Sequence, residues 1–450
     1  MTTATLEAIA DQLASGLTTS RALVEQCLAR INDPKGQGAT VFLRVDGTAA
    51  LGAADGMDAL RAAGAAPSRY AGIPISVKDL FDIEGQVTRA GSRVLADSPP
   101  ARSTATAVAR LRAAGFVIIG RTNMTEFAFS GLGLNPHYGT PLSPWRPHER
   151  RIAGGSTSGG AASVADGMAH AALGTDTGGS CRIPAAFTGL VGFKPTASRV
   201  PKDGAVPLSR TLDCVGPMAR SVNCCAILDA VLANETIHSL ESRDLNSIRV
   251  LVPTTIALDS LDPVVASAFE RTLRILSEHD VHVTTAEVPE LSQIPVMNAK
   301  GGFAAAESFA WHATLLGSDG DRYDPRVSAR IRRGSEQSAA DLISLMDARA
   351  ELIAAIAARM RNFDALVLPT VPIPPPRLAD LDGDAEFSRV NLLALRNPAI
   401  INMIDGCAIS IPMHRDDEPP MGLMIAACSN QDRTVLEVAR AFEIALSTAR

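Results

Sequence analysis

Short apolar runs of strand length alternate with helical segments along most of the 450-residue sequence. Ile73–Val77, Ile248–Val252 and Leu423–Ala427 are three such runs, and residues 263–278 between the last two carry apolar side chains at helical spacing. A chain built this way can bury its apolar runs only in a sheet that is covered by helices. The pattern therefore predicts an α/β protein in which helices cover both faces of a β-sheet.

The remaining elements follow from the same periodicities. Two amphipathic helices open the chain, with apolar stripes at Leu6, Ile9 and Leu13 and then at Leu23 and Ile31. The region 292–362 is almost entirely helical by its pattern. Further strands are expected at 116–119, 171–173, 191–193, 364–368 and 408–411, and further helices at 105–114, after 160 and at 431–447.

We expect Met346, Leu352, Ile353 and Ile356 to face inward in the long helical region. No internal repeat is visible, and the longest linker is the stiff proline run of 369–376. Residues 1–450 are therefore expected to form a single domain.

Charge and cysteine usage exclude several classes of protein. The net charge is −6, and no run of lysine or arginine suggests a nucleic-acid surface. The seven cysteines are odd in number and form no C-x-x-C pair, which favours reduced thiols in a cytoplasmic protein over a disulfide framework or a zinc site. The N-terminus lacks the apolar core of a signal peptide, and no run approaches the roughly 20 apolar residues of a membrane span.

Two glycine-rich turns carry the serines that we single out. Asp176-Thr177-Gly178-Gly179-Ser180 lacks bulky side chains, so several backbone N–H groups can converge on one point and stabilise an oxyanion. The phosphate-binding alternative lacks the lysine that should follow the glycines. In the second turn, residues 154–160, either Ser156 or Ser158 could place its hydroxyl between Ser180 and a base.

Lys78 is the candidate base. It ends an apolar run in a chain with only five lysines, and burial would lower its pKa toward neutrality. Taken alone, Lys78 would more often form a salt bridge to Asp79. Together with the two serine turns, it supplies the parts of a serine hydrolase that uses no histidine. Neither serine lies in a G-x-S-x-G elbow, which argues against an α/β-hydrolase.

These three places resemble the amidase signature family, whose members share a Ser–cis-Ser–Lys triad. The resemblance rests on GTDTGGSCRIPA around Ser180, on the turn around Ser156 and on Lys78. Further matches are RTNMTEF at 121–127, TLDCVGPMARSV at 211–222 and ALVLPT at 365–370. They are dense over about 70–225 and sparse after 240.

The resemblance implies the amidase-signature fold with its large mixed sheet, and it implies specific roles. Ser180 would be the nucleophile, Ser156 the bridging serine of a cis peptide and Lys78 the base. The N–H groups of Thr177, Gly178, Gly179 and Ser180 would form the oxyanion hole. Substrate contacts are expected from Ser130, Gly131, Asn135 and Ser158.

Asp176 and Arg182 flank the nucleophile with opposite charges, and we interpret them as a structural pair. His279 and His282 span a helix end and a strand start, where a solvated turn fits better than a metal site. No metal or organic cofactor is implied.

The expected activity is hydrolysis of C–N bonds in amides, with esters, carbamates and ureido compounds as related substrates. Ile183 stands where an arginine would have suggested a carboxylate-bearing substrate, so we expect a neutral, partly apolar or aryl one. The alternative is a glutaminase-type subunit of an amidotransferase, which would need a partner. Apart from that alternative, we expect the protein to bind a small-molecule substrate and neither nucleic acid nor membrane. We expect it to be a monomer or a homodimer.

Overall fold

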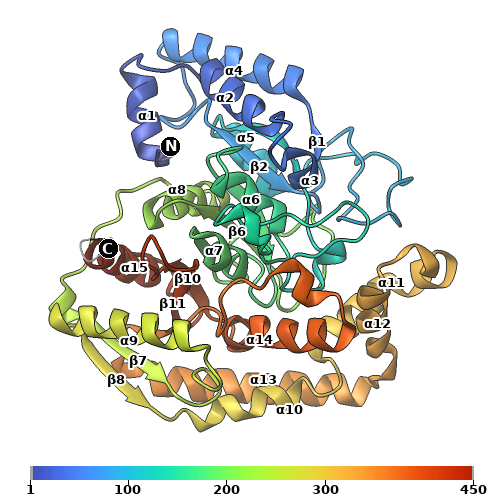
Figure 1. The fold of residues 1–450 in the computed structure, drawn as a ribbon, viewed down its shortest axis with the longest axis vertical. Helices are drawn as coiled ribbons and strands as arrows, with labels where there is room; N and C mark the ends of the chain where they lie inside the picture. Colours follow the sequence, from blue (N-terminus) through green and yellow to red (C-terminus); the bar gives the residue numbers. More distant parts are fainter. Residues whose placement is uncertain (1–3, 448–450) are drawn as a thin grey trace.

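One mixed sheet of eleven strands organises the chain in the computed structural model, which describes residues 4–447 (Figure 1). In spatial order the strands are β1 (Phe42–Val45), β3 (Val117–Thr122), β2 (Pro74–Lys78), β4 (Ala172–Asp176), β6 (Cys214–Ala219), β5 (Val191–Lys194), β10 (Cys407–Pro412), β11 (Gly422–Ala427), β9 (Ala365–Pro369), β7 (Arg249–Pro253) and β8 (His282–Ala286). Parallel pairs join β3, β2 and β4 near one edge and β9, β7 and β8 at the other. The strands between them pair antiparallel.

Fifteen α-helices within residues 4–447 surround this sheet (Figure 1). They are α1 (Leu6–Ala14), α2 (Ser20–Ile31), α3 (Gly38–Val41), α4 (Gly47–Ala62), α5 (Thr106–Ala113), α6 (Ser158–Ala165), α7 (Arg182–Thr188), α8 (Val222–Ala233), α9 (Pro263–Glu278), α10 (Gln293–Met297), α11 (Gly302–Ser318), α12 (Pro325–Arg332), α13 (Ala339–Arg359), α14 (Asp384–Met403) and α15 (Asp432–Ser447).

Successive strand residues enter opposite cores, which confirms that helices cover both faces. Ile409 and Ile425 belong to a core with residues of α8, α9 and α15, whereas their neighbours Ala408 and Met424 belong to a core with residues of α13 and α14. This alternation follows from the two-residue period of a strand. The predicted α/β class and the two-sided covering of the sheet are therefore correct.

The expected helix signals hold at the N-terminus. Leu6, Ile9 and Leu13 are buried on α1, and the hydroxyl of Thr19 caps α2 by accepting a hydrogen bond from the N–H of Ala22. The expectation for the long helical region is wrong in one position. Met346 is 57% exposed, because it lies on the solvent side of α13, whereas Leu352 of the same helix is buried.

Two strands were not expected from the sequence. The strand β1 is only four residues long, and β6 contains Gly216 and Pro217, which disfavour a central strand. Only the last two residues of β6 pair with β5, so the proline lies outside that ladder. None of the helices in the described range 4–447 combines the length and the apolar character that crossing a bilayer requires.

Candidate active site

Lys78 is the last residue of β2 and is fully buried. Its Nζ donates hydrogen bonds to Ser156 Oγ at 2.8 Å and to Thr175 Oγ1 at 2.9 Å. Burial lowers the pKa of Lys78 to about 8, although the charges around it, that of Asp213 among them, act in the opposite direction. The predicted salt-bridge alternative is absent in the described residues, since Asp79 pairs with Arg121 instead. The lysine is thus a candidate base near neutral pH.

Ser156 lies in the glycine-rich turn that precedes α6. The Gly155–Ser156 peptide bond is cis, as the resemblance implies. Glycine is needed at 155 because a Cβ there would lie 2.5 Å from the backbone nitrogen of Gly133. Ser158 begins α6, and its buried hydroxyl has no hydrogen-bond partner within residues 4–447. Of the two candidate serines, Ser156 is therefore the one that contacts Lys78.

Ser180 lies in the turn between β4 and α7 and lines a large cavity. Its carbonyl oxygen accepts a hydrogen bond from the N–H of Thr157 at 3.3 Å, which ties the two serine turns together. Its hydroxyl makes no hydrogen bond to any residue in the described range. The structure thus forms the Lys78–Ser156 link of the predicted relay but not a hydrogen bond between Ser156 and Ser180.

The backbone N–H groups of the turn after β4 fall into two sets, one bound to Asp176 and one without an acceptor among the described residues. The N–H of Gly179 donates to Asp176 Oδ1 at 2.8 Å, and the N–H of Cys181 donates to Asp176 Oδ2 at 3.1 Å. The N–H groups of Thr177, Gly178 and Ser180 have no acceptor among the residues that the structure describes. The expectation that Gly179 contributes to the oxyanion hole disagrees with this geometry, because its N–H holds Asp176. Three of the four expected donors are available.

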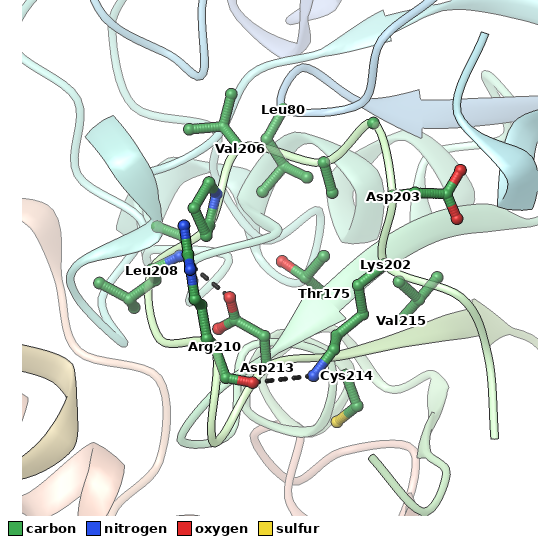
Figure 2. Close-up of a pocket in the computed structure, with 14 residues that line it drawn as sticks. Leu80, Thr175, Lys202, Asp203, Val206, Leu208, Arg210, Asp213, Cys214 and Val215 are labelled. Atoms are coloured by element: carbon green, nitrogen blue, oxygen red, sulfur yellow. Dashed lines mark hydrogen bonds between the residues drawn. The ribbon is translucent and has the colours of Figure 1, made fainter. Parts of the chain in front are cut away.

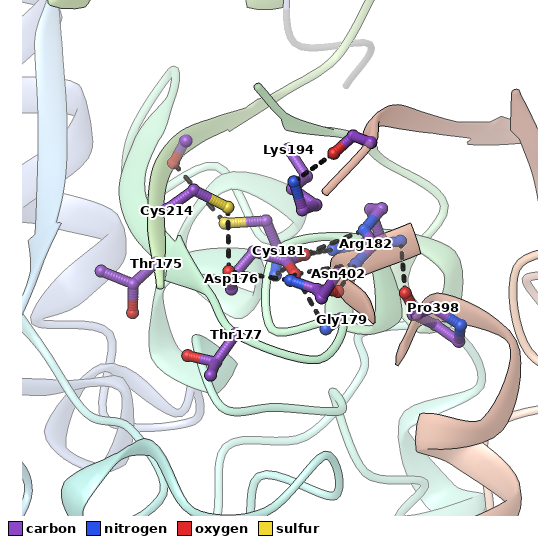
Figure 3. A network of polar contacts seen from close by, with 12 residues as sticks. Thr175, Asp176, Thr177, Gly179, Cys181, Arg182, Lys194, Cys214, Pro398 and Asn402 are labelled. Carbon is purple, nitrogen blue, oxygen red and sulfur yellow. Dashed lines mark hydrogen bonds and ion pairs between the residues drawn. The ribbon is translucent and has the colours of Figure 1, made fainter. Parts of the chain in front are cut away.

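Asp176 and Arg182 form the fully buried ion pair that the sequence suggests (Figure 3). Arg182 donates from Nη2 and Nε to the two carboxylate oxygens at 2.8 and 3.0 Å. Burial alone would raise the pKa of Asp176, but Arg182 holds that pKa below its ordinary value. Asn402 of α14 accepts from Arg182 Nη2 at 2.6 Å and donates to the carbonyl of Asp176 at 3.3 Å. This bracing by Asn402 had no local sequence signal.

The large cavity has a volume of about 670 Å³. Ser130 lines it, and Asn391 of α14 accepts hydrogen bonds from the Ser130 hydroxyl and the Gly131 N–H, both at 2.9 Å. Asn135 does not line it, because its side chain donates to the carbonyls of Gly91 and Met124 at 2.8 Å. Gly131 and Ser158 also lie outside the lining, so of the four expected substrate contacts the structure brings only Ser130 to the cavity that holds Ser180.

A second, smaller cavity has a volume of about 250 Å³ (Figure 2). Thr175 and Asp213 line it, and Asp213 accepts hydrogen bonds from the hydroxyl of Thr177 at 2.5 Å and from the N–H of Leu208 at 3.0 Å. Burial raises the pKa of Asp213 to about 6. Leu208 and Ala128 line both cavities. Sequence reasoning missed Thr175, which accepts a hydrogen bond from Lys78, and Asp213, which accepts one from Thr177.

Within residues 4–447 no group of three or more His, Cys, Asp or Glu side chains could hold a metal ion. His279 and His282 lie at the end of α9 and the start of β8, as expected.

Comparison with known proteins identifies the class. The amidase family model matches residues 22–436, and the chain belongs to this family, the amidase signature enzymes. It is an amidohydrolase that acts on carbon–nitrogen bonds. A solved structure described as an amidase is 32% identical and superposes with a TM-score of 0.89 over 98% of this chain and 99% of its own.

Two curated relatives differ in what they do. The 2-amino-5-chloromuconic acid deaminase of Comamonas testosteroni is 35% identical over 88% of this chain and 87% of its own length. A glutamyl-tRNA(Gln) amidotransferase subunit of Chloroflexus aggregans is 30% identical over 98% of this chain and 96% of its own. The chain is thus similar both to an enzyme named for an acid substrate and to a subunit of an amidotransferase.

Proposed function

We propose that the protein hydrolyses the C–N bond of a small acyl compound through an acyl-enzyme on Ser180, with Ser156 as proton relay and Lys78 as base. The observation that carries this proposal is the buried hydrogen bond from Lys78 Nζ to Ser156 Oγ beside a cavity that exposes Ser180. A buried lysine with a lowered pKa, held among hydroxyl groups, is suited to accept a proton.

The reaction has two halves. As Ser180 Oγ attacks the carbonyl carbon, its proton passes to Ser156, and the proton of Ser156 passes to neutral Lys78. The N–H groups of Thr177, Gly178 and Ser180 stabilise the oxyanion, and each donor of this kind is worth roughly 2.7–4 kcal/mol in the transition state. The proton then returns along the relay to the leaving nitrogen as the C–N bond breaks. Water attacks the acyl-enzyme in the second half, with the same groups accepting its proton, and the acid and free Ser180 result.

This route needs the Ser180 hydroxyl to come within hydrogen-bond distance of Ser156. Catalytic hydrogen bonds commonly tighten only when substrate binds. Aryl esters, carbamates and ureido compounds pass through the same type of tetrahedral intermediate, so they are candidate side substrates. The named substrate of the Comamonas relative is a small acid, which directs attention to acids as well as to neutral amides.

The second candidate function is a glutaminase-type subunit that delivers ammonia to a partner. The similarity to the glutamyl-tRNA(Gln) amidotransferase component over nearly the whole chain favours it. The same nucleophile and relay would operate, but turnover would depend on the partner chain.

Treatment with a fluorophosphonate, followed by intact-mass spectrometry and peptide mapping, tests the proposal. We expect one adduct on Ser180, which is lost in Lys78→Ala and strongly slowed in Ser156→Ala. Ser158→Ala is the matched variant two positions away, and it is expected to keep the adduct. An adduct on another serine, or labelling that survives Lys78→Ala, would exclude the proposed relay. Labelling of Ser180 without turnover of any amide by the isolated chain would favour the partner-dependent glutaminase.

A further inference from the structure

The lining of the large cavity is rich in arginine. Four arginines line it, at positions 330, 333, 389 and 396, and the lining includes no Asp or Glu. Two of the four arginines are exposed and have partners outside the cavity lining. Arg389 is 61% exposed and forms a bidentate ion pair with Glu386 at 2.6 and 2.8 Å, and Arg333 is exposed and donates to the carbonyl of Ala299. Arg330 and Arg396 remain.

Arg330 projects from α12 and is partly buried. Its Nη1 donates to the carbonyl of Phe129 at 3.0 Å, one residue before Ser130, and its guanidinium lies 5.0 Å from the ring centre of Phe387. It forms no ion pair with a carboxylate in the described part of the chain, although the charge of Asp324 acts on it from a longer distance. Burial lowers the pKa of Arg330, and the charge of Asp324 only partly opposes this shift.

Arg396 projects from α14 and is also partly buried. Its Nε donates to Asn397 Oδ1 at 3.1 Å and its Nη2 to the carbonyl of Ala257 at 3.4 Å. It forms no ion pair with any residue from 4 to 447, and burial lowers its pKa, a shift that the charge of Asp259 opposes. Each of the two guanidinium groups thus keeps several of its five N–H donors for a ligand.

The fully buried arginines elsewhere in the protein behave differently. Arg121 pairs with Asp79, and Arg182 pairs with Asp176, both at 2.8 Å. Withdrawing a guanidinium from water without a carboxylate partner is unfavourable. Two such groups that line the cavity of Ser180 and form no ion pair are best explained by an anion that binds there.

We propose that the cavity binds an acyl substrate that carries a carboxylate, with Arg330 as the main receptor and Arg396 as a second cation. The inference rests on the proposed function, since it assumes that Ser180 attacks a substrate held in this cavity. The hydrogen bond of Arg330 to the carbonyl of Phe129 holds the guanidinium at the residue before Ser130, and all three line the cavity that holds Ser180. A guanidinium matches a carboxylate with two parallel hydrogen bonds.

The rest of the wall fits the skeleton of such a substrate. Leu208, Leu212, Ile256, Leu395 and Ile400 line it. These side chains suit an aliphatic or unsaturated chain between the carboxylate and the C–N bond to be broken. The substrate is therefore a small amide or related C–N compound that is itself an acid.

This proposal replaces the expectation of a neutral substrate. That expectation depended on Ile183, but Ile183 is fully buried in a core with Phe187 and Val390 and does not line the cavity. The positive charge comes instead from α12 and α14, far along the chain.

Calorimetric titration with adipate and with 1,6-hexanediol tests the inference, because the two share a six-carbon chain and differ in carboxylate against hydroxyl. We expect adipate to bind at least about tenfold more tightly than the diol. Arg330→Gln should weaken adipate binding about 10- to 100-fold, as charge-assisted hydrogen bonds are lost. Arg330→Lys should weaken it less, since it keeps the charge. Thermal unfolding shows whether each variant is folded.

Arg332→Gln is the matched control. Arg332 lies two positions further along α12, is exposed and does not line the cavity, so its loss should leave adipate binding unchanged. Equal binding of acid and diol would overturn the proposal, as would affinity that is unaltered in folded Arg330→Gln and Arg396→Gln proteins.

The readout separates this inference from the proposed function. Calorimetry detects binding alone, so Ser180→Ala should bind adipate as the unaltered chain does. Arginine-dependent adipate binding without fluorophosphonate labelling would refute the hydrolytic role of Ser180 and keep the acid site. Labelling of Ser180 that neither adipate nor the arginine variants affect would support the hydrolytic role of Ser180 and refute the acid site.

Discussion

Lys78 Nζ and Ser156 Oγ form a 2.8 Å hydrogen bond between two fully buried residues. Lys78 can accept a proton only as the neutral amine, and burial lowers its pKa to about 8. The rate of Ser180 phosphonylation should therefore rise about tenfold per pH unit below pH 8 and level off above it. Labelling rates between pH 6 and 10 measure this. A rate that falls as pH rises would contradict the assignment of Lys78.

Thr175→Val provides the matched variant for that profile. The hydroxyl of Thr175 accepts the second hydrogen bond of Lys78, at 2.9 Å, and valine has the same shape without an acceptor. Loss of an acceptor disfavours the ammonium form, so the midpoint of the profile should move to lower pH. An unchanged midpoint in a folded variant would show that Thr175 does not tune the lysine.

Gly179→Ala should destabilise the protein by about 1–3 kcal/mol and abolish labelling of Ser180. Gly179 has φ +126°, and a Cβ there would lie 2.6 Å from Pro398 Cβ and 2.7 Å from Ile183 Cδ1. The turn would have to shift, and the Gly179 hydrogen bond to Asp176 would be lost. Chemical denaturation gives the free energy of unfolding.

Gly178→Ala is the neighbouring control for stability. A Cβ at 178 would meet only Leu395 Cδ2, at an ordinary 3.6 Å. We expect a change below about 1 kcal/mol in the free energy of unfolding. A loss as large as that of Gly179→Ala would show that the whole turn, and not position 179, is sensitive.

Arg182→Met should cost about 3–5 kcal/mol of stability at pH 7, because it leaves the Asp176 carboxylate buried without its partner. The loss should shrink on acidification. With Arg182 present, the pKa of folded Asp176 lies below its ordinary value, so the stabilisation exists above about pH 4 and is lost as pH falls. Without Arg182 that pKa is raised, and acid favours the variant. Denaturation at pH 4 and pH 7 tests this, and a loss that is equal at both would contradict it.

Local patterns were sufficient for part of this structure. The glycine-rich turns around Ser156 and Ser180, and the end of the strand at Lys78, could be placed because each depends on neighbouring residues. The α/β class followed from the alternation of strand-length runs and helices. The strand β6 could not be predicted, since Pro217 breaks the expected pattern and the segment is held extended by tertiary pairing with β4 and, at its end, with β5.

The partners supplied by distant segments could not be predicted either. Asn402 reaches Asp176, and Arg330 reaches the carbonyl of Phe129, across more than two hundred positions of sequence. The resemblance assigned Gly179 to the oxyanion hole, but it could not show that the N–H of Gly179 points to Asp176. The prediction that Met346 faces inward failed because an apolar stripe along a helix does not reveal which of its residues meet the core.

The tie between α14 and the turn after β4 has a consequence for the order of events during synthesis. A nascent chain that ends before Pro398 already contains Lys78, Ser156 and Ser180, yet Arg182 lacks the carbonyl of Pro398 and the amide of Asn402. The strand β5 likewise pairs with β10, which comes after Pro398 in the sequence. The contacts that brace the turn of Ser180 are thus complete only once residues 398–412 have been made, so shorter nascent chains carry this serine without these contacts.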